Sequence, residues 1–338
     1  MPIFLKNKNN LYQNDSVKAE NMINPDALKA IFHESLKLTY NESCLIVTDT
    51  VKENIGRCFY DFAKQITLRA KIMVMEPRHE HAQEPPDEIA GEMLLFDVQF
   101  LITDKSLSHT RARRKASEKG SRIASMPAVT EDIINRCCLI DYDSLRQRSR
   151  ELHAVLSKSL SVRITTVLGT DIVFKIGKNR WFGENGGTFD YPGAFGNLPE
   201  GEVSFTPLEA QGTYFVDASF PGLGILESPL CFKVKDSFVY EIEGKQASLV
   251  RKRLDDAGDK AYRVAELGIG LNPKAKIIGY VLEDEKMLGT VHIALGNNLS
   301  FGGDNDVPLH LDGVILKPDI YVDGRKIMRK GSFIEQIF

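Results

Sequence analysis

The sequence contains no apolar segment of about 18 residues, the length that a transmembrane helix requires, so we expect no membrane span. Its first ten residues hold no apolar run long enough for a signal peptide, and a cytoplasmic protein is therefore expected. The formal net charge is only -3, which favours neither nucleic acid nor an anionic membrane as a partner. The composition, with 43% hydrophobic and 26% charged residues, is that of a soluble globular protein.

The sequence also lacks paired cysteines and the glycine-rich motifs of nucleotide-binding proteins. Its five cysteines are odd in number and none forms a C-x-x-C pair, a pattern typical of reduced thiols rather than of a disulfide framework. No G-x-G-x-x-G or G-x-x-x-x-G-K-[ST] motif opens an expected helix. We therefore do not expect a dinucleotide or a nucleoside triphosphate as the ligand.

The first half alternates short apolar strands with helices. Helices are expected over residues 55–67 and 109–119, and strands over Cys44–Asp49, Ala70–Met75, Val98–Asp104 and Arg122–Pro127. Such alternation predicts an open, mostly parallel sheet with helices on both faces. An amphipathic run over residues 130–160 predicts one or two helices that lead to the second half.

From Ser161 onward, short strands and glycine-rich turns replace the helices. Residues 161–176 indicate two strands around a turn at Gly169 and Thr170. We therefore predict an α/β protein of two domains, with an open α/β domain over residues 1–162 and a second domain over residues 163–338.

Two histidines of the second half lie in predicted strands. In T-V-H-I-A-L-G, His292 shares a strand face with small neighbours, which leaves room for a ligand. In L-H-L-D-G-V, His310 and Asp312 share a face and present an imidazole beside a carboxylate. This set of nitrogen and oxygen ligands suits zinc, cobalt, manganese or ferrous iron. A lone strand histidine is more often a hydrogen-bonded core residue, so the prediction depends on further ligands nearby.

Two glutamates supply those further ligands. Glu202 begins a predicted strand, and Glu266 stands in an apolar stretch before an expected turn at Gly268 and Gly270. A carboxylate among apolar neighbours must be paired, protonated or bound to metal. Together the three carboxylates and two imidazoles could hold two divalent cations about 3.5–4 Å apart, a centre that activates water and polarises a carbonyl group.

The second half resembles the aminopeptidase T / AmpS family of two-metal peptidases. The resemblance is carried by N-L-P-E-G-E-V-S-F-T-P at 197–207, A-E-L-G-I-G-L-N-P at 265–273, D-E-K-M-L-G-T-V-H-I-A-L-G at 284–296, G-G-D-N at 302–305 and H-L-D at 310–312. It implies an α+β catalytic domain after the open α/β domain, and a homodimer. It also implies two divalent ions (zinc, cobalt or manganese) held by Glu202, Glu266, His292, His310 and Asp312.

The same resemblance implies a leucyl aminopeptidase-like hydrolase that removes N-terminal residues from small peptides. Glu202 or Glu266 would then be the bridging ligand or the catalytic base. Two features depart from that family: Leu299 stands where its peptidases have a tyrosine at the metal centre, and the segment between the two histidines is short. Tyr321 or Tyr280 could replace the tyrosine in space.

These departures leave two alternatives open. The first is a ring-cleaving dioxygenase similar to 2,5-dihydroxypyridine 5,6-dioxygenase, with one ferrous ion held by His292, His310 and Asp312 as a 2-His-1-carboxylate set. The absent tyrosine favours this hypothesis, whereas retention of Glu202 and Glu266 disfavours it. The second alternative is a metal-binding relative without catalytic activity.

Overall fold

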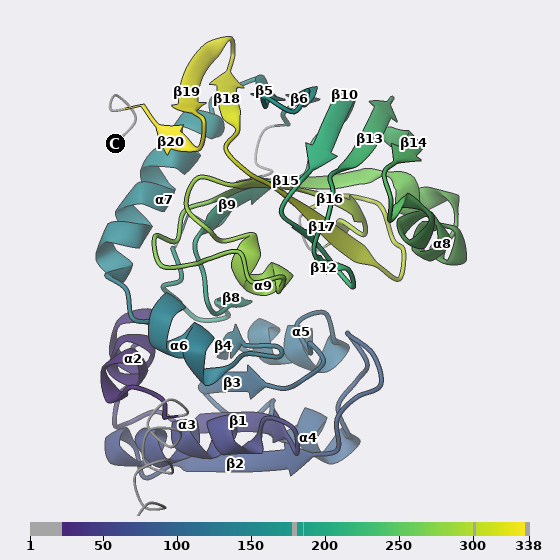
Figure 1. The fold of residues 1–338 in the computed structure, drawn as a ribbon. Helices are drawn as coiled ribbons and strands as arrows, with labels where there is room; N and C mark the ends of the chain where they lie inside the picture. The colour runs from purple at the N-terminus through teal and green to yellow at the C-terminus, as the bar shows by residue number, and fades with distance from the viewer. Residues whose placement is uncertain (1–21, 178–180, 185, 300–301, 335–338) are drawn as a thin grey trace, which may run out of the picture.

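The computed structural model describes residues 22–177, 181–184, 186–299 and 302–334. Figure 1 shows two halves, one above the other, with helix α7 (Tyr142–Leu156) running along one side from the lower half to the upper. In the lower half, five parallel strands form one sheet. Their order is β2 (Ala70–Met75), β1 (Cys44–Asp49), β3 (Val98–Ile102), β4 (Arg122–Ser125) and β8 (Phe195–Asn197).

Helices cover both faces of this sheet, as the alternation of the sequence predicts. One face packs Cys44, Ile46 and Phe100 against helices α2 (Pro25–Lys29), α3 (Glu53–Ile66) and α6 (Glu131–Cys137). The other face packs Leu45 and Val47 against α4 (Asp87–Glu92) and α5 (Arg111–Glu118). Because strand side chains alternate between faces, strands buried on both sides read as continuous apolar runs.

The upper half is built from antiparallel sheets. The larger has the order β14 (Phe238–Glu243), β13 (Leu230–Lys235), β10 (Glu209–Val216), β6 (Asp171–Lys175), β5 (Ser161–Thr165), β18 (Asp319–Val322), β19 (Arg325–Arg329) and β20 (Ser332–Phe333). The smaller has the order β17 (His310–Ile315), β16 (Val291–Gly296), β15 (Val264–Gly270), β9 (Glu202–Phe205) and β7 (Trp181–Phe182). Short elements complete this half: the hairpin β11 (Ser219–Phe220) and β12 (Gly224–Ile225), and helices α8 (Ala247–Ala257) and α9 (Val281–Asp284).

Both sheets of the upper half contribute to one apolar core, in which the rings of Tyr214 and Phe232 stack at 4.7 Å. The predicted fold class is therefore confirmed: a parallel α/β half is followed by a half of antiparallel sheets with few helices. Across the described residues, the structure contains no helix that is long and apolar enough to cross a membrane.

The chain returns once to the first sheet after it has entered the second half. Strand β8 pairs with β4 in parallel, and in Figure 1 it is the strand of the lower sheet nearest the upper half. Only four residues separate its end at Asn197 from the start of β9 at Glu202. The division into domains at residue 162 stays a prediction, and β8 is a strand that the two parts share.

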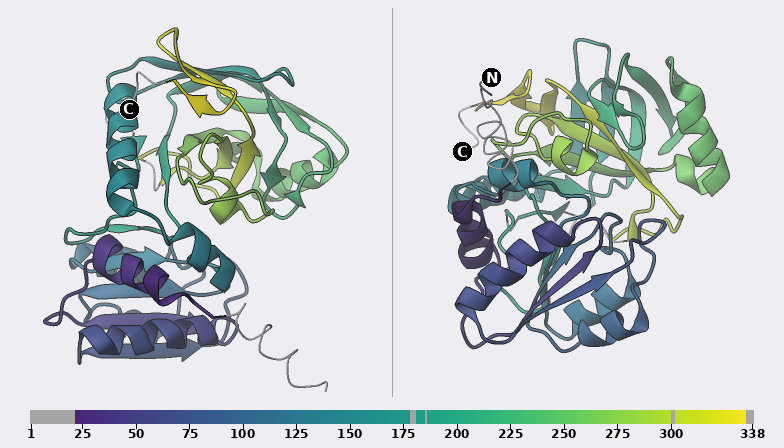
Figure 2. Two further views of the ribbon diagram at one scale, coloured as in Figure 1. Left: turned by 60° about the vertical axis from the view of Figure 1, so that its left-hand side comes forward. Right: turned by 60° about the horizontal axis from the view of Figure 1, so that its bottom comes forward.

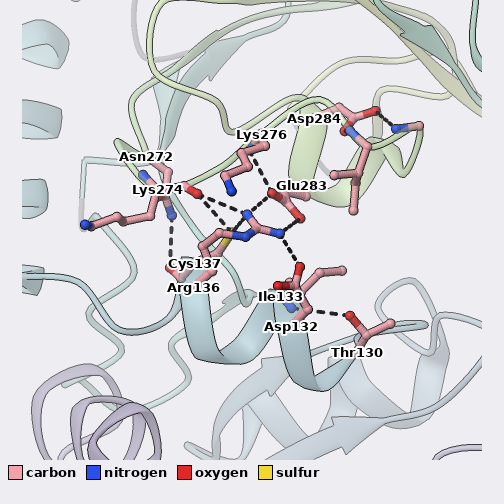
Figure 3. Close-up of polar contacts among 12 residues, drawn as sticks. Thr130, Asp132, Ile133, Arg136, Cys137, Asn272, Lys274, Lys276, Glu283 and Asp284 are labelled. Atoms are coloured by element: carbon pink, nitrogen blue, oxygen red, sulfur yellow. Dashed lines mark hydrogen bonds and ion pairs between the residues drawn. The ribbon is translucent and has the colours of Figure 1, made fainter. Parts of the chain in front are cut away.

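A buried polar network fastens the two halves together at α6 (Figure 3). The Arg136 guanidinium pairs with the fully buried carboxylate of Glu283, which also accepts a hydrogen bond from the backbone N–H of Lys276 (2.7 Å). The buried Asn272 amide donates to the carbonyl oxygens of Cys137 (3.1 Å) and Glu200 (2.8 Å). Figure 2 shows the same halves in contact from two further directions. These contacts hold the loop after β15 against the first half.

Candidate metal centre

The smaller sheet of the upper half brings all five predicted site residues to one face. Asp312 on β17 pairs with Ala294 on β16, and Ala294 pairs with Glu266 on β15, so these three residues form one row across the sheet. Directly paired residues on adjacent strands point to the same side. His292 and His310 lie two residues from Ala294 and Asp312 along their strands and share that side.

Three glycines pair directly with residues of the centre, and one of them makes room for a site imidazole. Gly268 pairs with His292, Gly270 with Glu202, and Gly296 with His310. A Cβ atom on Gly268 would lie 2.1 Å from Nε2 of His292, so the imidazole passes directly over this backbone. Gly268 and Gly270 belong to strand β15 and not to a turn, which corrects the expectation from sequence. Gly268 lets the His292 ring reach across β15, whereas Gly270 lies against the backbone of Met287 and the hydroxyl of Thr290.

The five side chains form a continuous polar cluster. His292 Nε2 lies 3.2 Å from Glu202 Oε2 and 3.8 Å from Glu266 Oε1. His310 Nε2 lies 3.1 Å from Glu266 Oε2 and 3.1 Å from Asp312 Oδ1. The carboxylate of Glu266, which is 2% exposed, therefore stands between the two imidazoles.

The electrostatics of the cluster favour bound positive charge. Burial by itself would lower the pKa of His292, yet Glu266, Glu202 and the other nearby carboxylates raise it to about 9. Burial would likewise raise the pKa of Glu266, but its interactions with His292 and His310 lower that pKa below its usual value. A buried site with more carboxylates than cations attracts protons or metal ions.

Several donor atoms lie close enough together to hold a divalent ion. Three overlapping groups each bring their ligand atoms within 4.8 Å of one another: Glu202, Glu266 and His292; Glu266, His310 and Asp312; and Glu285, His292 and Asp312. Two atoms of the cluster, Nδ1 of His292 and Oε2 of Glu202, are buried without a hydrogen-bond partner. Nδ1 of His310 lies 2.7 Å from the carbonyl oxygen of Asn297. That contact fixes the tautomer and leaves the lone pair of Nε2 for a metal.

Two residues of this centre, Glu285 and Lys286, were not predicted as site residues. The Lys286 ammonium is 1% exposed and lies 2.6 Å from both Glu202 Oε1 and Glu285 Oε1. Burial raises the pKa of Glu285 to about 7 and that of the nearby Glu200 to about 8. The available signal was D-E-K at 284–286, a charged run shortly before a buried strand, but similar runs are common in exposed turns.

The first half also contributes to the surroundings of the centre. His109 precedes α5 and interacts electrostatically with both His310 and Glu266. Burial, with repulsion from His310 and Arg113, lowers the pKa of His109 to about 4, so this imidazole is uncharged at neutral pH. The loop before α5 is tied to the sheet by Ser108, whose hydroxyl contacts Ser125 and Asn197. The candidate centre therefore lies where the two halves meet.

The structure shows where Leu299 lies, the residue that replaces the tyrosine of the peptidases. Leu299 lies in the loop after β16 and is 48% exposed. Of the tyrosines considered as substitutes, Tyr280 donates its hydroxyl to the carbonyl oxygen of Pro127 (2.8 Å), and Tyr321 belongs to β18 of the larger sheet.

Comparison with known proteins identifies relatives that cover this whole region. The family model described as 2,5-dihydroxypyridine 5,6-dioxygenase (NicX) matches residues 65–335. The 2,5-dihydroxypyridine 5,6-dioxygenase of Pseudomonas putida KT2440 is 22% identical over 262 residues, which are 73% of this chain and 74% of that protein.

Two solved structures share the fold. The 2,5-dihydroxypyridine dioxygenase of Pseudomonas putida KT2440 superposes with a TM-score of 0.78 at 16% identity, over 91% of this chain and 96% of that one. Wild-type AmpT from Thermus thermophilus superposes with a TM-score of 0.67 at 16% identity, over 92% of this chain and 98% of that one. At such identities, these superpositions establish the fold alone.

These findings correct the leading functional expectation. The prediction of a leucyl aminopeptidase-like hydrolase with a peptide substrate is wrong, because the family model and the similar curated protein are both dioxygenases. The likeness to the aminopeptidase T group is one of fold. The family still indicates a metal-dependent protein. Neither the identity of the metal (zinc, cobalt or manganese) nor the expected number of two ions is supported by these findings.

Proposed function

The chain belongs to the 2,5-dihydroxypyridine 5,6-dioxygenase (NicX) family, and we propose from this membership that it is an oxidoreductase that opens a dihydroxylated aromatic ring with dioxygen. The observation that carries the proposal is the extent of the family match, since residues 65–335 include the entire metal cluster and His109. A pyridine ring with two hydroxyl groups is the substrate class that the family description supports.

We propose that His292, His310 and Asp312 hold a single ferrous ion. Two imidazoles and one carboxylate form the ligand set of non-haem iron oxygenases, which leaves coordination positions open. A ferrous ion held there supplies the one-electron chemistry that lets dioxygen react with an electron-rich ring. Asp312 is a member of a potential ligand group with each histidine, whereas none of the three groups found among the described residues contains both imidazoles. We therefore expect Glu266, which now stands between the two rings, to shift when the ion binds.

The remaining polar residues position these ligands and line the site. The carbonyl oxygen of Asn297 orients the His310 ring, and Oε2 of Glu202 lies 3.2 Å from Nε2 of His292. Partners of this kind typically change metal affinity by about 10–100-fold when they are removed. Burial lowers the pKa of His109 to about 4, so this uncharged imidazole is a weak base that can form a hydrogen bond with a substrate hydroxyl group.

The proposal is tested by oxygen consumption. The protein is loaded with ferrous iron under anaerobic conditions. It is then mixed, in oxygenated buffer, with 2,5-dihydroxypyridine and with other dihydroxylated pyridines and benzenes. We expect one dioxygen consumed for each ring lost, together with a bleached ring absorbance. Zinc-loaded protein and the Asp312→Asn variant are the controls, and both should be inactive. If protein that holds iron consumes no oxygen with any of these rings, the proposal is wrong.

We also propose that the protein is a homodimer, the state that the resemblance to the aminopeptidase T / AmpS family implies. Its mass in solution, measured by light scattering, should be that of two chains. A monomeric mass at micromolar concentration would contradict this assignment.

A further inference from the structure

Lys286 is a buried cation inside the wall of the metal centre. It follows α9 on the turn that leads into β16, and only 1% of it is exposed. Its ammonium lies at 2.6 Å from one oxygen of Glu202 and at 2.6 Å from one oxygen of Glu285. An ammonium group is a point charge with three donors, so it can neutralise two carboxylates at once.

The two carboxylates that Lys286 contacts are themselves potential metal ligands. Glu202 belongs to a ligand group with Glu266 and His292, and Glu285 belongs to another with His292 and Asp312. His292, the member that these groups share, is 1% exposed and its Nδ1 has no hydrogen-bond partner. The cluster thus has ligands for more than one ion, but the lysine already occupies one oxygen of each of its two outlying carboxylates.

A second metal ion would have to share its carboxylate ligands with the Lys286 ammonium. Ions in two-metal centres stand about 3.5–4 Å apart and need oxygens at about 2.0–2.2 Å. An ion held by Glu202, Glu266 and His292 would take Oε2 of Glu202, which has no hydrogen-bond partner, while Oε1 of the same carboxylate lies 2.6 Å from Nζ. An ion held by Glu285, His292 and Asp312 would likewise share the Glu285 carboxylate with Nζ. The second ion and the Lys286 ammonium are both positive, and no additional carboxylate is present to balance them. They would therefore repel one another strongly in this buried site.

We propose that Lys286 is a built-in second cation that limits this centre to one metal ion per chain. The inference deepens the proposed function, since it rests on the same metal centre and explains how a cluster with several spare carboxylates holds a single ion. The residue sets metal number and does not itself touch the reacting atoms. It is therefore a specificity-determining residue for the cofactor.

The test compares metal stoichiometry in Lys286→Met and Lys286→Arg. Methionine removes the charge at similar length, whereas arginine keeps it. Metal-free proteins are titrated with Mn²⁺, and bound ions are counted by elemental analysis after dialysis. We expect about one ion per chain for the wild type and for Lys286→Arg, and about two for Lys286→Met. The second ion should give the electron paramagnetic resonance signal of spin-coupled manganese.

A purely structural ion pair predicts a different result. In that case Lys286→Met is unstable to the same degree with and without Mn²⁺, and it binds one ion. If Lys286 replaces a cation, Mn²⁺ restores the melting temperature of Lys286→Met towards that of the wild type. The double variant Lys286→Met/Glu285→Gln, which removes a charge of each sign, serves if the single variant does not fold. It should fold and bind one ion.

Two outcomes overturn the inference: a wild type with two Mn²⁺ ions, one of which is lost in Glu202→Gln, or a folded Lys286→Met that binds only one. These outcomes are separate from the fate of the proposed function. One ion in the wild type and two in Lys286→Met, without oxygen consumption by iron-loaded wild type, would retain the inference and reject the dioxygenase. Oxygen consumption by the iron-loaded wild type, with one ion bound by both the wild type and Lys286→Met, would retain the dioxygenase and reject the role of Lys286.

Discussion

A single methyl group added at Gly268 would disturb the metal centre directly. The His292 imidazole lies over its backbone, and that position allows Nε2 to approach both Glu202 and Glu266. The backbone of Gly268 has an ordinary strand conformation, so the requirement for glycine here is one of space. The sheet itself does not need this glycine, but the site does.

We predict that Gly268→Ala loses metal while the protein remains folded. The new Cβ atom would lie 2.1 Å from the imidazole and force His292 out of place, so metal affinity should fall by about 10-fold or more. The measurement is the Mn²⁺ dissociation constant by calorimetry. Gly91→Ala in helix α4, where the new Cβ atom meets no heavy atom within 4 Å, is the matched control and should bind normally. Equal affinities in the two variants would contradict the steric role of Gly268.

Residue chemistry allowed part of this site to be predicted. His292, His310 and Asp312 were found because strand alternation places them on one face, and Glu266 because a carboxylate in an apolar run needs a partner. Their assignment as ligands stays a prediction. Lys286 was missed because a lysine between charged neighbours is normally exposed, and its burial depends on the fold around α9.

Helices and strands of the first half agree closely with their sequence patterns. The expected strands Cys44–Asp49 and Ala70–Met75 have these bounds in the structure, and the run over residues 130–160 is two helices, α6 and α7. Local caps define these helices: Thr130 and Asp141 accept hydrogen bonds from the backbone N–H groups of Ile133 and Ser144. Such signals lie within a few residues, so sequence alone reveals them.

The connection between α6 and the loop after β15 depends on Arg136. We predict that Arg136→Met lowers the free energy of unfolding by about 3–5 kcal/mol, because it leaves the fully buried carboxylate of Glu283 without its cation. Urea unfolding measures the change. Arg57→Met is the control: its partner Glu53 lies one helical turn away on the solvent-facing side of helix α3, so the loss should be about 0.5 kcal/mol. Similar decreases in the free energy of unfolding for the two variants would mean that the buried Arg136–Glu283 pair stabilises the protein no more than an exposed pair.

At the scale of the whole molecule, a bound ion should stabilise the second half. The proposed ligands come from two strands, β16 and β17, and the carboxylates around them from β9, β15 and the turn after α9. Unfolding would separate all of these groups, so the metal binds the folded state alone. An ion at 100 times its dissociation constant contributes about 2.7 kcal/mol.

We predict that chelation lowers the melting temperature by about 5 °C and that Fe²⁺ or Mn²⁺ restores it. Differential scanning calorimetry under nitrogen measures the shift. The double variant His310→Gln/Asp312→Asn should melt at one temperature with and without metal. A metal-dependent shift that persists in this variant would place the ion elsewhere in the molecule.

The sequence by itself determined the α/β class, most of the secondary structure of the first half and the residue types of a metal cluster. Periodicity, caps and the cost of burying a lone carboxylate act locally, so they can be recognised without coordinates. Only the tertiary structure decided that Gly268 and Gly270 lie in a strand, that Gly268 makes room for an imidazole, and that β8 returns to the first sheet. It also decided that Lys286 is buried against Glu202 and Glu285. These features depend on the register between strands and on contacts between the two halves, and both are fixed by packing across the whole chain.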